Sequence, residues 1–199
     1  MTPRQLSISV IVMLAIAIAM GVLVWRTRKT NSAIQTAQTN SAPVAPPVSG
    51  PTEQVTLYAA DDDSGVLRPI AARVPLASDR QQRGEQTLQA LVKFYSDKSS
   101  HHVLAEGSEI RAFYLVEPGL AVIDLNGAFA NGHRSGVLVE SLTIASLAKT
   151  LSANLPDITQ IEFLVDGKPR ETLAGHADLS GVYDVSSLNQ LADQLQNGQ

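Results

Sequence analysis

Cysteine is absent from this chain of 199 residues. Its absence excludes disulfide bonds, zinc sites built from thiolates, a cysteine nucleophile and a lipid-modified N-terminal cysteine. Tryptophan is nearly absent as well, because the one Trp, Trp25, lies ahead of the region that we expect to fold. Sugar-binding sites usually stack an aromatic ring on the sugar face. A glycan-binding role would therefore depend on the four Tyr residues.

Acidic residues are missing from the first 29 positions, where Arg4, Arg26, Arg28 and Lys29 are the only charged side chains. The other 11 Lys and Arg residues accompany all 19 acidic residues, so the rest of the chain carries a net charge of −8. Proteins that bind nucleic acid usually need a basic surface for the phosphates. An acidic body without a basic stripe therefore argues against nucleic acid as a partner.

A long apolar run, LSISVIVMLAIAIAMGVLVW, occupies residues 6–25 and contains no charge. A helix of this length spans roughly 30 Å, the thickness of the hydrocarbon core of a bilayer. Trp25 followed by Arg26 is typical of a membrane interface. A cleaved signal peptide is the alternative, with Ala-Ile-Ala at 17–19, but the apolar run continues past that pattern. We expect an uncleaved membrane anchor over residues 1–29.

The next segment, residues 30–52, is rich in Pro, Ala and Ser, which predicts a flexible tether. A folded domain is expected over 53–185, and a short C-terminal helix or tail over 186–199. More positive charges follow the apolar run than precede it. By the positive-inside rule, this charge count would place the folded domain in the cytoplasm.

Six strands are predicted from alternating or β-branched runs that are separated by turn residues. Asp61–Gly65, Glu117–Gly119 and Asp166–Lys168 supply the turns. The expected strands cover residues 55–58, 66–75, 109–116, 120–125, 158–165 and 170–173.

Three helices are predicted from apolar residues at spacings of 3, 4 and 7. The first covers 80–95 and is capped by Ser78-Asp79, the second ends at Asn154 and Pro156, and the third covers 187–196. The order ββα-ββα-ββ predicts an α+β fold. We expect one mixed, largely antiparallel sheet with two main helices packed on it, preceded by the N-terminal transmembrane helix.

The polar clusters do not complete a known metal or phosphate motif. Asp61–Gly65 lacks the Gly and Glu positions of an EF-hand loop, which favours a solvated turn. His101 and His102 are adjacent, so in an extended segment their side chains point to opposite faces, and His133 is isolated. No catalytic, cofactor-binding or metal residue is predicted, and no cofactor is expected.

Two weaker catalytic interpretations remain open. His176 and Asp178 would suit an acid–base pair, although bonding to backbone groups in an ordered loop is the alternative. Asp124 paired with Glu117 or Asp178 would suit a hydrolase if the carboxylates lay about 5–10 Å apart. Ser135, within Gly132–Gly136, comes one place late for a nucleophile elbow and is instead expected to cap the second helix.

Several segments, in this order, resemble the GerMN domain, also called the sporulation and spore germination domain. They are VTLYAADDDSGVLRPIAARVP, GEQTLQALVKFY, AEGSEIRAFYLVEPGLAVIDLNGAF, ESLTIASLAKTL and ITQIEFLVDGKPRETLAGHADLS, which together cover residues 55 to about 179. The most specific are the Val122–Asn126 run with Phe129 and the FLVDGKP–ETL–GHADLS stretch.

The resemblance implies a small α/β domain outside the cytoplasmic membrane that serves as a non-catalytic part of a cell-envelope assembly. It implies that Gly167, Gly175 and Asp178 shape the backbone. It also favours an extracytoplasmic domain, against the charge count. The chain departs from lipoprotein members of the family, because it has no cysteine and carries the apolar run at 6–25 instead.

The sequence therefore predicts a membrane-anchored, non-enzymatic binding or scaffold domain with envelope or membrane proteins as partners. A link to sporulation or germination is implied by the family alone. The open face of the sheet or an exposed strand edge is the expected surface. A peptidoglycan-binding or glycan-binding module is the alternative, and an envelope hydrolase is the second rival.

Overall fold

The computed structural model describes residues 50–116 and 118–196. The predicted anchor, 1–29, and all but the end of the tether, 30–52, lie outside these residues. Among the helices that the structure describes, none is long and apolar enough to span a bilayer.

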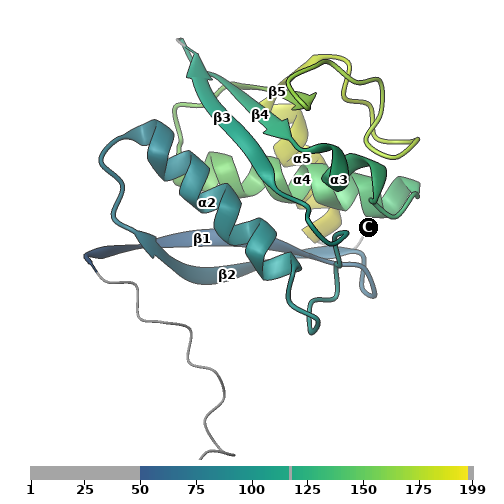
Figure 1. Ribbon diagram of the computed structural model, residues 1–199, viewed down its shortest axis with the longest axis horizontal. Coiled ribbons are helices and arrows are strands. Elements are labelled where there is room, and N and C mark those ends of the chain that lie inside the picture. The colour runs from purple at the N-terminus through teal and green to yellow at the C-terminus, as the bar shows by residue number, and fades with distance from the viewer. Residues whose placement is uncertain (1–49, 117, 197–199) are drawn as a thin grey trace, which may run out of the picture. The chain divides into compact units, whose positions relative to one another are not determined.

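The described part of the chain is an α+β domain, which confirms the predicted class (Figure 1). Helix α2 (Arg80–Tyr95) is capped by Asp79, whose side chain accepts a hydrogen bond from the Gln82 N–H, as its sequence predicted. The short helix α3 was not predicted, and it begins where Asn126 accepts from the Phe129 N–H. The strands are β1 (Thr52–Asp61), β2 (Val66–Pro75), β3 (Ile110–Val116), β4 (Leu120–Leu125), β5 (Gln160–Val165) and β6 (Val182–Asp184); the helices are α2 (Arg80–Tyr95), α3 (Gly127–Asn131), α4 (Val137–Asn154) and α5 (Val185–Gln196).

The strands form two sheets, so the prediction of one sheet is wrong in this respect. Strands β1 and β2 make a two-stranded antiparallel hairpin, and the other four strands follow the order β3-β4-β5-β6. Within the larger sheet β4 and β5 are parallel, and the other neighbours are antiparallel. Helices α3 and α4 form the long crossover that parallel neighbours require.

Side chains of α4 explain why no further strand joins the free edge of β1. Asn154 bonds both the N–H and the carbonyl of Thr56, and Tyr58 is bonded in the same way by Thr150 and Ser146. These three α4 residues are four apart, and one turn of a helix nearly matches two residues of a strand. The helix therefore satisfies the backbone groups that a neighbouring strand would otherwise bond.

The sixth strand predicted at 170–173 is also wrong, because β6 lies at Val182–Asp184. The intervening chain holds only isolated bridges, Val165 with Lys168 and Thr172 with Asp178. Its backbone N–H groups at Ala174 and Ala177 donate to the Glu140 side chain instead of to a strand. A side chain therefore takes the place of a strand neighbour in this segment.

Helices α2 and α4 lie on the inner side of the four-stranded sheet, and the β1–β2 hairpin lies beyond them (Figure 1). The core includes Phe113, Ile123 and Phe163 from the sheet, and α5 packs against α4. Gly84 allows α2 to approach β3 closely, because a Cβ at this position would lie 2.3 Å from the Phe113 ring.

Candidate functional site

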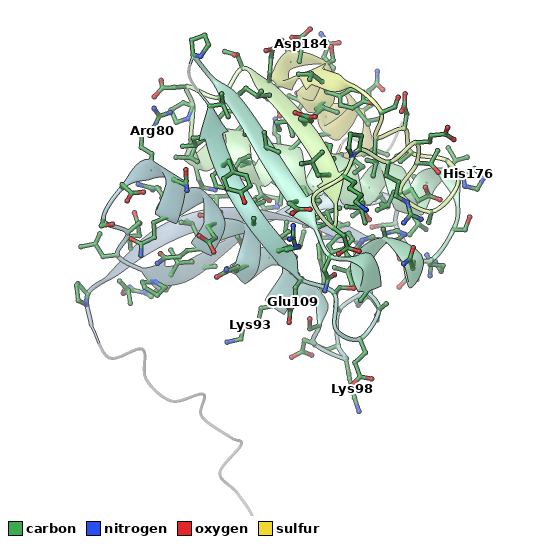
Figure 2. All side chains as sticks on the ribbon, turned by 45° about the horizontal axis from the view of Figure 1, so that its top comes forward. Arg80, Lys93, Lys98, Glu109, His176 and Asp184 are labelled. Atoms are coloured by element: carbon green, nitrogen blue, oxygen red, sulfur yellow. The ribbon has the colours of Figure 1, made fainter. Side chains whose placement is uncertain are left out.

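The outer face of the four-stranded sheet is not covered by any helix among the described residues (Figure 2). Side chains alternate between the two faces of a strand, and Phe113, Ile123 and Phe163 point inward. The residues between them therefore point outward. The pairing register places on this face Ala112, Tyr114, Val116, Leu120, Val122, Asp124, Gln160, Glu162, Leu164, Val182 and Asp184.

Three large side chains with apolar surface are exposed on the outer face. Tyr114, Val116 and Val182 are 49%, 47% and 51% exposed, although each is a large apolar residue on a regular strand. Glu162 lies in register with Val122 on one side and Val182 on the other. Exposed apolar side chains gathered on one face are typical of a surface that contacts another molecule.

Asp124 closes one end of this face and is only 1% exposed. Its carboxylate is bonded to the Arg111 guanidinium and accepts the Gly167 N–H at 2.8 Å. Asp166, in the same turn, has a positive φ of 52° and accepts the Gly127 N–H at 2.9 Å. Gly167 also has a positive φ, as expected for the second turn position. The Asp-Gly turn is therefore held by Asp124, whose carboxylate is already occupied.

Glu140 of α4 organises the loop that contains the GHADLS segment. One carboxylate oxygen accepts the N–H groups of Ala174, His176 and Ala177, and the other accepts that of Gly136. The His176 ring Nδ1 lies 3.0 Å from the second oxygen. Burial alone would raise the pKa of Glu140, but the backbone N–H bonds outweigh it and lower this pKa to about 2.

The comparison with protein families matches residues 56–171 to the family described as Germane, sporulation and spore germination. This range includes the second half of β1, all of β2 to β5 and both long helices that pack on the larger sheet. The chain belongs to the GerMN family. The family predicted from the sequence motifs is thereby confirmed. The match ends at Glu171, ahead of the GHADLS loop of this GerMN domain.

The GerMN chain is similar to several solved structures. A candidate lipoprotein from Clostridium perfringens is 20% identical, with a TM-score of 0.43, and the match covers 71% of this chain and 92% of that one. The tandem GerMN domains of the sporulation protein GerM from Bacillus subtilis are 18% identical, with a TM-score of 0.49, and the match covers 65% of this chain and 44% of that one. The first GerMN domain of GerM alone is 14% identical, with a TM-score of 0.43 and coverage of 64% and 92%. No curated protein matches the sequence.

His176 and Asp178 of the GerMN domain do not form a pair with each other in the described contacts. His176 contacts Glu140, and its Nδ1 also lies 3.4 Å from the Ser135 hydroxyl. Asp178 accepts the N–H and the hydroxyl of Ser180. The prediction that Ser135 caps α4 is wrong. Gly136 is the capping residue, and Glu140 accepts its N–H. Both contacts of His176 use Nδ1, which does not match a serine–histidine–acid relay, where the base contacts the nucleophile through the other nitrogen.

The acidic turn and the two adjacent histidines, which the sequence separates by 40 residues, lie together. His101 is exposed and its Nδ1 is 3.1 Å from Asp63, whereas His102 is buried and 2.7 Å from Asp62. His101, Asp61 and Asp63 have ligand atoms within 4.8 Å of one another. A cation there would compete with Arg68, whose guanidinium lies 3.0 Å from Asp61.

His102 and His133 belong to a buried polar network rather than to an open site. Both rings contact the Thr143 hydroxyl, at 2.9 Å and 2.8 Å. Burial lowers the pKa of His102 although Asp62 opposes the shift, and burial likewise lowers the pKa of His133. The two rings link α4 to the loops that contain Asp62 and Arg134.

A stripe of polar side chains along α4 was not predicted from the sequence; its members are Glu140, Thr143, Ser146, Thr150 and Asn154. All but Asn154 are fully buried, and they follow one another along α4 at spacings of three and four residues. Polar residues at helical spacing inside an otherwise apolar helix were the available signal. They indicate a helix whose polar contacts are made inside the domain.

The depressed pKa of Glu140 predicts a pH dependence of stability. A carboxylate whose pKa is lower in the folded state stabilises that state above its unfolded pKa, near 4.5, and this contribution is lost as pH falls towards 2. We expect the free energy of unfolding to drop by about 3 kcal/mol from this group over that window. Urea unfolding from pH 6 to pH 2.5 would measure the loss, which should be smaller in Glu140→Gln. The prediction would be contradicted if the free energy of unfolding fell equally with pH in the two proteins.

Proposed function

We propose that this chain is a membrane-anchored, extracytoplasmic and non-catalytic domain that binds protein partners in a bacterial cell-envelope assembly. The observation that carries the proposal is the uncovered outer face of the four-stranded sheet. Tyr114, Val116 and Val182 expose apolar surface there, and such surface is usually covered by a partner. A role in sporulation or germination follows from the description of the family and belongs to the same proposal.

The occupied carboxylates support a non-enzymatic role. Asp124, Glu140 and Asp178 already accept hydrogen bonds from backbone N–H groups that fix loops. A general acid or base needs a proton-accepting atom directed at a substrate. The bonds of these three groups instead stabilise the loops that they contact.

The position of the domain relative to the membrane rests on the sequence. The apolar run at 6–25 would anchor the chain, and residues 30–52 would let the domain reach partners away from the bilayer. A C-terminal alkaline phosphatase fusion should be active in intact cells. A second C-terminal fusion would carry a fluorophore that fluoresces only in the cytoplasm. Fluorescence of that fusion, together with an inactive phosphatase fusion, would contradict the extracytoplasmic placement.

Charge placed on the outer face should remove partner binding without unfolding the domain. We expect Tyr114→Asp and Val182→Asp to lower recovery of crosslinked envelope proteins from intact cells at least tenfold, as truncation of a binding hot spot does. The measurement is crosslinking, purification of the full-length chain from membranes and identification of the proteins that accompany it.

Val103→Asp is the matched control, because Val103 is 62% exposed but lies in the loop before β3. Its partner recovery should equal that of the unchanged chain, and all three variants should keep the same melting temperature within a few degrees. Recovery that is unchanged in Tyr114→Asp would contradict the assignment of this face. Recovery with the sacculus alone, released by wall digestion, would favour the glycan-binding alternative.

A further inference from the structure

A trough lies between β2 and α2, on the side of the hairpin away from α4. Its central hollow has a volume of about 410 Å³, and its floor includes Leu57, Ile70, Ala72 and Ala90. A second hollow of about 370 Å³ shares Arg73, Ala90 and Lys93 with the first. The two hollows therefore form one elongated depression with an apolar floor.

The basic residues beside this trough lack acidic partners within the described chain. Most Arg residues of the domain are paired, as Arg68 is with Asp61 and Arg83 with Glu53. Arg73 and Lys93, which line both hollows, form no ion pair among the described residues. Lys93 and Lys98 project from the same side of the domain (Figure 2). Asp97 also lines the central hollow, so Arg73 and Lys93 leave the trough with a net positive charge on an otherwise acidic domain. A net positive lining favours an anionic ligand.

The backbone of β2 offers hydrogen bonds along the same trough. The N–H groups of Thr56 and Tyr58 point away from β2, towards α4. In an antiparallel pair, the residues opposite them, Ala71 and Pro69, also direct their backbone groups away from the partner strand. The N–H groups of Ala71 and, by alternation, Arg73 are therefore directed outward at the edge of β2.

Two prolines limit the length of this edge. Pro69 and Pro75 occupy positions of β2 at which, as at Ala71 and Arg73, the backbone nitrogen is directed away from β1. Because proline has no N–H, each removes a donor from the outer edge without removing a hydrogen bond of the hairpin. The edge is open to a short extended segment, and it resists pairing along its full length.

We propose that the trough between β2 and α2 binds a short, extended, acidic segment of a partner protein. The backbone of the segment bonds Ala71 and Arg73, and its apolar side chains lie on Ile70, Ala72 and Ala90. Its carboxylates, on the opposite face of the segment, pair with Arg73, which alternation along β2 directs away from Ile70 and Ala72, and reach Lys93 at the rim of the trough. The concave shape favours a peptide over a membrane surface, because a flat bilayer does not reach the floor of a depression. This site is separate from the outer face of the four-stranded sheet.

The test uses the full-length chain in nanodiscs of zwitterionic lipid and fluorescein-labelled Glu-Leu-Glu-Val-Glu-Leu-Glu. We expect saturable binding by fluorescence anisotropy, weaker at higher salt, and none to the peptide with Lys in place of Glu. Arg73→Glu and Lys93→Glu should each weaken binding by about fivefold or more, because an ion pair is replaced by repulsion.

Lys168→Glu is the matched control, since it makes the same charge change in the turn after β5. Binding that is retained in this variant and lost in Lys93→Glu would support the site. Equal losses in both variants, or no saturable binding of the acidic peptide, would overturn the proposal. Acetylation of the Lys93 amine would be measured with the peptide and, separately, with phosphatidylglycerol added to the discs. Protection of Lys93 by the lipid and not by the peptide would also overturn the proposal. Tyr114→Asp should leave peptide binding unchanged, so the proposal for the trough and the proposal for the outer face can be tested independently.

Discussion

Replacing Glu140 by alanine is expected to lower the free energy of unfolding by about 3–5 kcal/mol, because four backbone donors lose their buried acceptor together. The Glu140 side chain is fully buried, and it accepts N–H groups from Gly136, Ala174, His176 and Ala177. Three of these donors belong to a loop that has no strand neighbour. The loss should therefore be accompanied by local opening of residues 171–181.

Chemical denaturation of the full-length chain measures the stability change, and hydrogen exchange measures the opening of the loop. Glu140→Gln keeps the size of the side chain but turns an NH₂ group towards backbone donors, so it should also destabilise, by about 2–4 kcal/mol. Glu106→Ala is the control, because Glu106 is exposed and its loss should stay within about 0.5 kcal/mol. A loss below about 1 kcal/mol for Glu140→Ala would contradict the role assigned to this residue.

Gly84→Ala is expected to destabilise the domain by about 2 kcal/mol, even though alanine is the better helix former by about 1 kcal/mol. The new Cβ would lie 2.3 Å and 2.7 Å from two ring atoms of Phe113 and 3.0 Å from Leu155. All of these neighbours belong to the core, so they have little room to move. The helix and β3 would have to separate.

A double-mutant cycle tests this explanation. Phe113→Leu removes the two ring atoms that meet the new Cβ, so Gly84→Ala should cost at least about 1 kcal/mol less in that background. Gly181→Ala is the control, because its Cβ would come no closer than 3.8 Å to Tyr183. Additive effects of Gly84→Ala and Phe113→Leu would show that the close approach of α2 to β3 is not the cause.

Periodic segments were the part of the fold that could be predicted in detail. Strands β2 and β4 and helix α2 have the predicted bounds, because alternation, helical spacing and the cap at Asp79 are all local signals. Residues 170–173 also look locally like a strand. They are not one, because Glu140, some 30 residues away, accepts the N–H groups that follow them.

The candidate surface was predictable in kind but not in its residues. An α+β order implies a sheet with one open face, but the register decides that Tyr114, Val122 and Val182 share that face. The trough beside β2 had no sequence signal, because Arg73 and Lys93 come from different elements.

The class of fold, the family, the predicted anchor and the absence of cysteine chemistry could thus be inferred from composition, periodicity and ordered motifs. Each of these signals can be read without knowing which distant segments are in contact. The division into two sheets, the burial of Glu140 and the two candidate surfaces depended on contacts between distant segments. The side chains of α4 that bond β1, which lie 88 to 98 positions away in the sequence, are the clearest case. Such contacts arise only when packing brings the elements together, since the free energy of a buried hydrogen bond depends on its surroundings and not on its neighbours in sequence.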